Sequence, residues 1–436
     1  MSHSKMKTWP LYKKIFAGMI VGAMLGIILR NTIADVQTID SIITWVKPIG
    51  DIFMRMIFMM VIPLIVTGLI IGIADLGDLK RLGRIGLITL FSSLAITSVS
   101  VFIGISMANV FKPGNSLSVA DRQVLLEQYG SNSQTVVKQL SETKTRSVAD
   151  IITAIVPKNP LEEMVNAFNP NYSGGGLLAI MFFSVIIGVA LARADAEKTK
   201  TLRELIEGGY EVIMKVIGMA MELAPIGVAA LLCALTAKLG LSIFSVLLQY
   251  VLVVIIALLI HQFVTYSLVL KYISKLNPIK FFKNISEVML TAFSTSSSNA
   301  TLPTAIRVTH DKVGLPKDIT NFILTVGSTA NQNGTALYEG VTVLFLAQCF
   351  GIDLDLSQQI IVVFISILSG IGTAGVPGGS LPVIMLILVS VGIPAESIAI
   401  IYGVDRLLDM CRTTLNVTGD IVIATAVHRL DSGKSI

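Results

Sequence analysis

Charged side chains are scarce in this chain of 436 residues. Asp, Glu, Lys and Arg make up 14% of it, against roughly 25% in an ordinary soluble domain. So few charges cannot cover a water-exposed surface, so most of the surface must face lipid, which excludes a cytosolic enzyme, a secreted module and a disordered chain. The formal net charge of +5 suits the loops of a membrane protein and is too small to indicate a nucleic-acid partner.

Cysteine and histidine are also rare. The three cysteines lie in apolar stretches without pairing or metal-ligand spacing, and the four histidines are scattered along the chain. This pattern excludes a disulfide framework and argues against a histidine metal cluster. Because no small-residue cleavage site follows Lys13 and Lys14, the apolar run after them is predicted to be a first span and not a signal peptide.

Long runs without any charge predict membrane spans. Each suits a helix crossing about 30 Å of hydrocarbon, the short ones with flanking residues. The runs cover 15–29, 56–74, 85–111, 172–192 and 241–270. A further amphipathic helix is predicted around 202–237, with its polar residues on one face and packed against another part of the protein.

The distribution of Lys and Arg predicts the orientation. Basic clusters precede the first run and recur at 80–84 and 193–203. Since cytoplasmic loops collect Lys and Arg, both termini and the 75–84 loop are expected on the cytoplasmic side of the plasma (inner) membrane, and the polar stretch 113–150 outside.

Three apolar segments of the C-terminal half are interrupted. Residues 356–395 contain no charge, and as one helix they would be about 60 Å long, twice the bilayer core. The Gly- and Pro-rich stretch 370–379 cannot continue a helix, which favours two half-length helices in a re-entrant hairpin. Two full spans joined by an apolar loop are the alternative. Polar breaks at 294–303 and 331–335 complete a pattern typical of a transporter binding site at the membrane midplane.

The last span, about 397–427, carries a polar face. Its members fall on one side of a helix and are expected to face a cavity; they are Asp405, Asp409, Arg412, Thr413, Asn416 and Asp420. Arg412 suits a carboxylate, Asp409 an ammonium group, and Asn416 with the hairpin-tip amides a second carboxylate. An acidic amino acid would satisfy all three. The alternatives are an internal Asp–Arg salt bridge that only pins helices and, for Asp405, hydrogen bonds to hairpin hydroxyls.

Four motifs in order resemble the dicarboxylate/amino acid:cation symporter family, the glutamate transporters. They are the hairpin tip 296–303, the break 331–338, the tip 372–378 and the stretch 409–420, with 111–114 ending the third span. The resemblance implies an all-α polytopic membrane protein with eight transmembrane helices plus two re-entrant hairpins, assembled as a homotrimer. It implies no enzyme activity and no organic cofactor.

The resemblance also implies a division of the chain for an elevator mechanism. Scaffold helices would occupy 1–81 and 151–237, with an extracellular loop at 113–150. The transport domain would comprise helix 3 (82–112) and residues 238–436. Within the latter lie helix 6, hairpin 1 (about 277–308), helix 7 (about 315–350), hairpin 2 (about 356–394) and helix 8 (about 395–428).

By the same resemblance, Arg412 binds the substrate's side-chain carboxylate and Asp409 its amino group. Asn416 and the backbone around Ser297 and Ser298 meet the α-carboxylate. Thr335 and Thr413 add contacts, and the tip at Val376, Pro377 and Gly378 closes over the ligand. The family's neutral amino acid carriers lack the arginine, so Arg412 favours an acidic substrate.

The sodium sites depart from the family pattern. One implied site combines Asp420 with carbonyls near Gly327, Asn331 and Asn416. A second involves Thr329 and hairpin carbonyls around Gly370, Ile371 and Thr373, and is weakened because Gln332 replaces a methionine. The third needs an aspartate where this chain has Asn333, and its partners on the third span, Ser93, Ile96 and Thr97, are altered too. Losing a carboxylate removes much of the attraction for a cation, so this site is expected to be absent or weak.

Glu339 stands where the family's animal glutamate transporters carry a glutamate linked to proton transport, which makes it a proton-coupling candidate. The alternative is a glutamate that only bonds a neighbouring helix. The sequence thus predicts secondary active transport of glutamate or aspartate, driven by Na⁺, H⁺ or both. An uncoupled or exchange-only carrier of acidic amino acids or dicarboxylates remains an alternative. An intramembrane hydrolase lacks a nearby base, and a passive anion channel fits the paired site less well.

Overall fold

A computed structural model describes residues 11–33, 35–77, 84–129, 153, 155–167, 172, 176–372 and 379–432. Every regular element in these ranges is helical. The N-terminal helices are α1 (Leu11–Thr32), α2 (Val36–Gly77), α3 (Arg84–Phe111), α4 (Val119–Tyr129), α7 (Pro160–Val165), α8 (Gly176–Arg193) and α9 (Ala196–Leu239). The C-terminal helices are α10 (Ser242–Ile260), α11 (Tyr266–Leu268), α12 (Pro278–Asn284), α13 (Ser286–Thr295), α14 (Ser298–Val308), α15 (Lys317–Ala330), α16 (Asn333–Cys349), α17 (Leu356–Gly372), α18 (Leu381–Ser390) and α19 (Tyr402–Ser432).

The described part of the chain holds five helices long and apolar enough to cross a membrane: Lys13–Thr32, Gln37–Ala74, Arg84–Ser116, Ala196–Leu239 and Ser242–Ser274. The predicted all-helical, polytopic membrane fold is therefore confirmed at this coarse level. The stretch 202–237, expected to be an amphipathic packing helix, belongs to α9, a helix of 44 residues that is itself long and apolar enough to span. The charged residues in the first half of α9 interrupt the charge-free pattern, so the sequence did not predict its full length.

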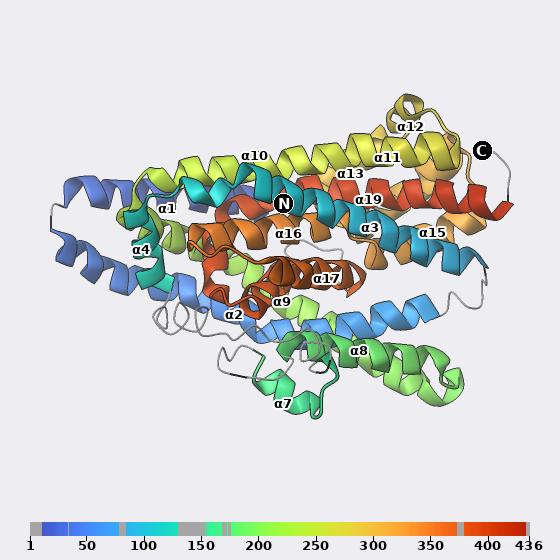
Figure 1. The fold of residues 1–436 in the computed structure, drawn as a ribbon, viewed down its shortest axis with the longest axis horizontal. Coiled ribbons are helices and arrows are strands. Elements are labelled where there is room, and N and C mark those ends of the chain that lie inside the picture. Colours follow the sequence, from blue (N-terminus) through green and yellow to red (C-terminus); the bar gives the residue numbers. More distant parts are fainter. Residues whose placement is uncertain are drawn as a thin grey trace, which may run out of the picture.

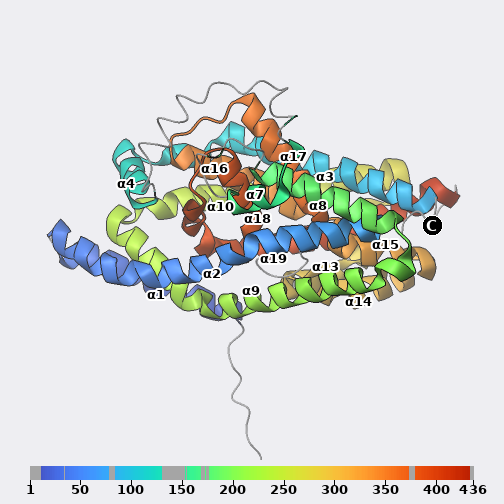
Figure 2. The same ribbon diagram turned by 90° about the horizontal axis from the view of Figure 1, so that it is seen from below.

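The long helices run roughly along the longest axis of the molecule (Figure 1). α9 packs along both α1 and α2, and α8 packs on α2. On the other side, α3 packs on α16, while α13 and α15 pack on α19. The view from below shows α1, α2 and α9 together on one face of the molecule (Figure 2). α17 and α18 contact α2 as well as α16, so they lie between the two groups.

A glycine seam joins α1 to α9. Gly18, Gly22 and Gly26 are four residues apart and share one face of α1. A β-carbon added at any of the three would run into the backbone of α9. Small residues at such spacing let two membrane helices approach backbone to backbone, where they gain van der Waals contact that larger side chains would prevent.

Two of the predicted interruptions are confirmed. α13 ends at Thr295, Ser296 adopts a left-handed backbone (φ 50°), and Ser297 caps α14 by accepting a hydrogen bond from the Ala300 amide at 3.2 Å. α15 ends at Ala330 and α16 begins at Asn333. At the third interruption, α17 ends at Gly372 and α18 begins at Leu381, while 373–378 lie outside the described residues.

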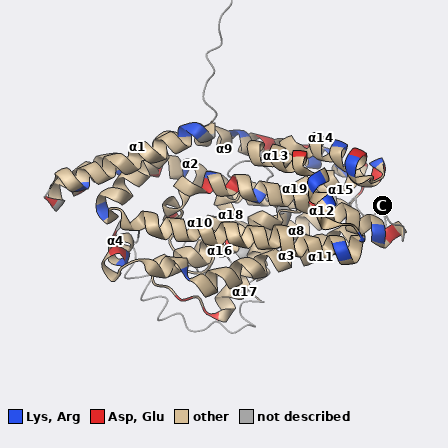
Figure 3. Ribbon diagram, turned by 90° about the horizontal axis from the view of Figure 1, so that it is seen from above, with Lys and Arg blue, Asp and Glu red and all other residues tan. Residues whose placement is uncertain are grey.

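The centre of the molecule is formed by α16 and α19. All seventeen residues of α16 are buried, so this helix has neither a lipid face nor a water face. Figure 3 shows α3 and α10 without charged residues over most of their length, whereas charged residues lie along α9 and near the middle of α19. A charge buried in the protein needs a local partner.

Candidate functional site

The polar face of α19 is buried in the centre of the protein. Asp405, Asp409, Arg412, Asn416 and Asp420 are each at most 4% exposed. Their spacing predicted that they share a face, and α13, α14, α15 and α16 all pack against this helix. Burial of two carboxylates and a guanidinium within two turns is costly unless the charges meet partners.

Arg412 forms ion pairs with both aspartates. Its Nε donates to Asp409 Oδ1 at 3.0 Å, and its Nη2 lies 2.9 Å from the same oxygen. Its Nη1 donates to Asp405 Oδ1 at 3.1 Å. The guanidinium also lies over the ring of Tyr338, 4.3 Å from its centre. The arginine is thus held from three sides, so little side-chain freedom remains to be lost if it binds a further group.

Asp405 meets different partners from those considered in the sequence. Tyr338 of α16 donates its hydroxyl to Asp405 Oδ1 at 2.8 Å, the same oxygen that Arg412 approaches. Among the described residues its side-chain bonds thus reach α16 and α19, and the alternative of hairpin hydroxyls stays open because 373–378 lie outside them. Sequence spacing within one helix cannot reveal which neighbouring helix faces it.

Arg406 was missed by the sequence analysis. Its Nη1 donates to Asp409 Oδ2 at 3.1 Å, and the two side chains are 12% and 6% exposed. Asp409 thereby meets a guanidinium on each of its oxygens. The signal was present, because residues three apart on a helix are neighbours, but it was overlooked beside the stronger pattern from Asp405 to Asp420.

Asn416 joins α19 to the break before α16. Its amide oxygen accepts a hydrogen bond from the Gly334 backbone N–H at 2.6 Å. Its amide nitrogen donates to Gln332 Oε1 at 2.5 Å and to Thr335 Oγ1 at 3.1 Å. Gln332 in turn donates its own backbone N–H to the Gly370 carbonyl at 3.2 Å. Asn416 and Thr335, which were predicted to bind substrate, therefore contact or adjoin Gln332, one of the two residues that depart from the family motif.

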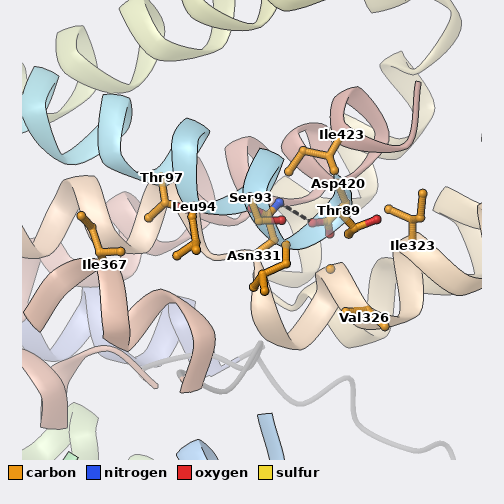
Figure 4. Close-up of a pocket in the computed structure, with 12 residues that line it drawn as sticks. Thr89, Ser93, Leu94, Thr97, Ile323, Val326, Asn331, Ile367, Asp420 and Ile423 are labelled. Carbon is orange, nitrogen blue, oxygen red and sulfur yellow. Dashed lines mark hydrogen bonds between the residues drawn. The ribbon is translucent and has the colours of Figure 1, made fainter. Parts of the chain in front are cut away.

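A small cavity of about 10 Å³ lies beside Asp420 and Asn331. Asn331 donates its side-chain N–H to Asp420 Oδ1 at 2.7 Å (Figure 4), while its own buried amide oxygen has no hydrogen-bond partner within the described ranges. Gly327, Thr89 and Thr97 also line the cavity. Its volume is about that of one water-sized probe, and the oxygen donors of a carboxylate and an amide are those that a hard cation prefers.

Asn333 lies in a closed network of neutral groups. Its amide oxygen accepts from the Thr97 hydroxyl at 2.6 Å, and its amide nitrogen donates to the Tyr266 hydroxyl at 3.1 Å. Its backbone carbonyl accepts from Ser100 at 2.8 Å. The two oxygens of Asn333 and the hydroxyl of Tyr266 thus already accept hydrogen bonds from neutral groups, and no carboxylate takes part in these bonds. The absence or weakness of the third sodium site stays a prediction.

Glu339 is fully buried on α16 and faces α17. Ser369 donates its hydroxyl to Glu339 Oε2, whereas Glu339 Oε1 accepts no hydrogen bond from the residues that the structure describes. A buried carboxyl oxygen without a partner carries a desolvation cost that a proton or a moving donor would relieve. The geometry fits both interpretations of Glu339, a bond to a neighbouring helix and a site for a proton.

The remaining predicted residues have mixed positions. Ser298 and Thr413 are buried, and Ser297 is half-buried as the cap of α14. Gly370 lies beside Gln332, as described above. Several others fall outside the described residues: Thr373, Val376, Pro377 and Gly378 entirely, and Thr329 and Ile371 in their side chains. The second sodium site and the hairpin closure therefore stay predictions.

Interrupted apolar helices around buried, ion-paired side chains such as Arg412, Asp405 and Asp409 are typical of polytopic membrane transporters. The model of the sodium:dicarboxylate symporter family matches residues 11–430, and the chain belongs to this family. The chain is 35% identical over 419 residues to the proton/sodium-glutamate symport protein of Bacillus subtilis (strain 168), covering 96% of this chain and 92% of that protein.

Two further relatives extend the comparison. The proton/glutamate-aspartate symporter of Escherichia coli (strain K12) is 34% identical, with 97% of this chain and 94% of that protein covered. Excitatory amino acid transporter 2 of Mus musculus is 30% identical, with 96% of this chain and 78% of that protein covered. The predicted family is confirmed across prokaryotic and animal relatives.

Proposed function

We propose that this protein is a secondary active carrier of glutamate or aspartate in the plasma membrane, coupled to Na⁺, H⁺ or both. One observation carries the proposal: Arg412 and Asp409 lie side by side in a buried site at the meeting point of broken helices. Relatives named as proton- and sodium-coupled glutamate symporters cover nearly the whole chain, which supports the same substrate class here.

The proposed site uses the charges of both ends of the ligand. Arg412 takes the side-chain carboxylate through its planar fork, and Asp409 takes the amino group. Asn416, Thr335 and Thr413 meet the remaining polar groups, with the α14 N-terminus at Ser297 and Ser298 and the segment 376–378 closing the site. When the ligand binds, ion pairs within the protein are exchanged for ion pairs with the ligand. No buried charge is therefore left without a partner of opposite charge.

We propose fewer sodium sites for this chain than the three that the family pattern implies. Asp420, with Asn331, Gly327 and Asn416, would hold one sodium ion, and a bound ion supplies positive charge that favours the acidic ligand nearby. The second site, around Thr329 and Gly370, is weakened by Gln332. The third, which would need an aspartate at Asn333, is absent or weak, and Glu339 is the candidate proton carrier. No organic cofactor takes part.

The proposed architecture has eight spans and two re-entrant hairpins in a homotrimer, with both termini cytoplasmic. α1, α2, α8 and α9 would form the scaffold, and α3 with α10 to α19 the part that moves as an elevator. The tight packing of α1 and α2 on α9 supports a common scaffold, because it ties together segments far apart in the chain.

Uptake into proteoliposomes tests this function. Radiolabelled L-aspartate or L-glutamate should accumulate against its gradient only when an inward sodium or proton gradient is imposed. The Arg412→Ala variant, reconstituted in parallel, should show no uptake. Concentrative uptake that ignores both gradients would refute coupling, and saturable equilibration alone would establish the uncoupled carrier of acidic amino acids or dicarboxylates.

A further inference from the structure

Arg406 holds the carboxylate that the proposed function assigns to the substrate's amino group. Its Nη1 donates to Asp409 Oδ2 at 3.1 Å, while Arg412 occupies Oδ1 from 3.0 Å. Both oxygens of Asp409 are therefore paired with guanidinium groups of the chain itself. An entering ammonium group has to compete with a cation that the chain itself supplies.

The four charges around Asp409 balance one another. Arg406 and Arg412 contribute two positive charges, and Asp405 and Asp409 two negative charges, within two turns of α19. A ligand that brings an ammonium group adds a third cation to this group, and one that brings only carboxylates adds none. Because all four side chains are at most 12% exposed, water screens these interactions only weakly.

Arg406 retains a donor that the chain does not use. Its Nε is buried and makes no hydrogen bond within the described part of the chain, whereas Nη2 of Arg412 lies 2.9 Å from Asp409 Oδ1 in an ion pair. A buried guanidinium N–H without an acceptor is uncommon in a protein interior. A free donor on Arg406 beside the charge of Arg412 would suit a ligand with two carboxylates, whether or not that ligand also carries an amine.

We propose that Arg406 is a specificity-determining residue that sets how strongly the site requires an amino group on its ligand. With Arg406 on Asp409 Oδ2, a four-carbon dicarboxylate binds to Arg412 and to Arg406 Nε without breaking the Arg406–Asp409 pair. The ammonium group of an acidic amino acid meets the positive charge of Arg406 at that oxygen. Arg406 thus lowers the ratio of the site's affinity for the amino acid to its affinity for the dicarboxylate. The inference rests on the proposed function.

L-Aspartate and succinate test this inference, because they differ by the amino group alone. Their affinities are measured by competition against radiolabelled L-aspartate on the full chain in nanodiscs, at one fixed sodium concentration and pH. Arg406→Gln removes the competing cation and keeps polar atoms at the position. The ratio of L-aspartate affinity to succinate affinity should rise by about tenfold, as expected for one charge-assisted hydrogen bond released to the ligand.

Two further variants separate this role from a structural one. Arg406→Lys keeps a cation beside Asp409 and should restore most of the wild-type ratio. Arg429→Gln removes the same charge from the last turn of the same helix, about 34 Å along its axis, and should leave the ratio unchanged. Loss of stability alone would weaken both ligands equally and would not move the ratio.

The outcomes distinguish this inference from the proposed function. A ratio that is unchanged or lower in Arg406→Gln, with wild-type protein binding L-aspartate, overturns the role of Arg406 and leaves the proposed function standing. Wild-type protein that binds neither ligand overturns both. A raised ratio in Arg406→Gln that Arg406→Lys reverses supports the inference.

Discussion

At the scale of single residues, the proposed site is a set of buried charges that neutralise one another. Arg412 contacts Asp405, Asp409 and the ring of Tyr338. Its removal therefore has two consequences. The ligand loses its carboxylate partner, and the two aspartates lose a compensating charge.

We predict that Arg412→Ala lowers the affinity for L-aspartate by at least about a hundredfold, the effect of a lost bidentate ion pair in a buried site. Arg412→Lys, which keeps the charge but not the fork, should lose less. Binding to purified protein, together with a thermal unfolding curve, separates ligand recognition from destabilisation. Unchanged L-aspartate affinity in Arg412→Ala would refute the assignment.

The second prediction at this scale concerns Asn333. Replacing it with Asp adds a carboxylate among Thr97, Ser100 and Tyr266, whose oxygens then lie around a negative charge that attracts a cation. We expect Asn333→Asp to increase the Hill slope for sodium in substrate binding, and Asn333→Ala, which adds no charge, to leave it unchanged. A slope that stays the same in the Asp variant would contradict the argument that the third site is lost here.

At the scale of elements, the sequence predicted the interruptions and the polar face of α19 well. Gly, Pro and hydroxyl residues inside apolar runs are local signals, and so is the spacing from Asp405 to Asp420. The partners across helices could not be predicted, because Tyr338 and Asp405 are 67 residues apart and meet only through packing. The length of α9 was also missed, since polar residues in its first half broke the charge-free pattern.

The contact between α1 and α9 gives a prediction for an element. A β-carbon at Gly22 would lie 2.6 Å from the Cα of Ala229, whereas nothing lies within 4 Å of one at Gly208. We expect Gly22→Ala to lower the unfolding temperature, because two backbones must separate. Gly208→Ala in α9 should instead raise stability by about 0.5–1 kcal/mol, the usual gain over glycine in a helix. Thermal unfolding in detergent would measure both; an equal effect of the two would contradict backbone contact along this seam.

At the scale of the whole molecule, the proposed elevator requires α19 to move against α1 and α9. A β-carbon at Gly403 of α19 would lie 3.0 Å from the Met19 sulfur of α1, so the two groups of helices touch there. Within the proposed scaffold, a β-carbon at Gly188 would lie 2.7 Å from the Ile73 β-carbon. The two contacts are therefore suited to a comparison. Met19 and Gly403 face each other between the proposed scaffold and the proposed moving part, whereas Ile73 and Gly188 both belong to the proposed scaffold.

We predict that cross-linking Met19→Cys to Gly403→Cys, with Cys233, Cys349 and Cys411 replaced by alanine, stops uptake while substrate binding persists. Cross-linking Ile73→Cys to Gly188→Cys in the same background should leave uptake unchanged. Uptake in proteoliposomes before and after a short thiol cross-linker, and again after reduction, gives the comparison. Full uptake with Met19 and Gly403 linked would argue against sliding at this boundary.

The complete burial of α16 bears on how the protein is made. A helix with Asn333, Glu339 and Gln348 among its seventeen buried residues has no surface suited to lipid, and it is absent from the helices apolar enough to span. Alone in the bilayer, its polar groups would cost several kcal/mol. We therefore expect this segment to leave the insertion machinery only in company with α3 and α19, so that biogenesis waits for the last helix of the chain to be synthesised.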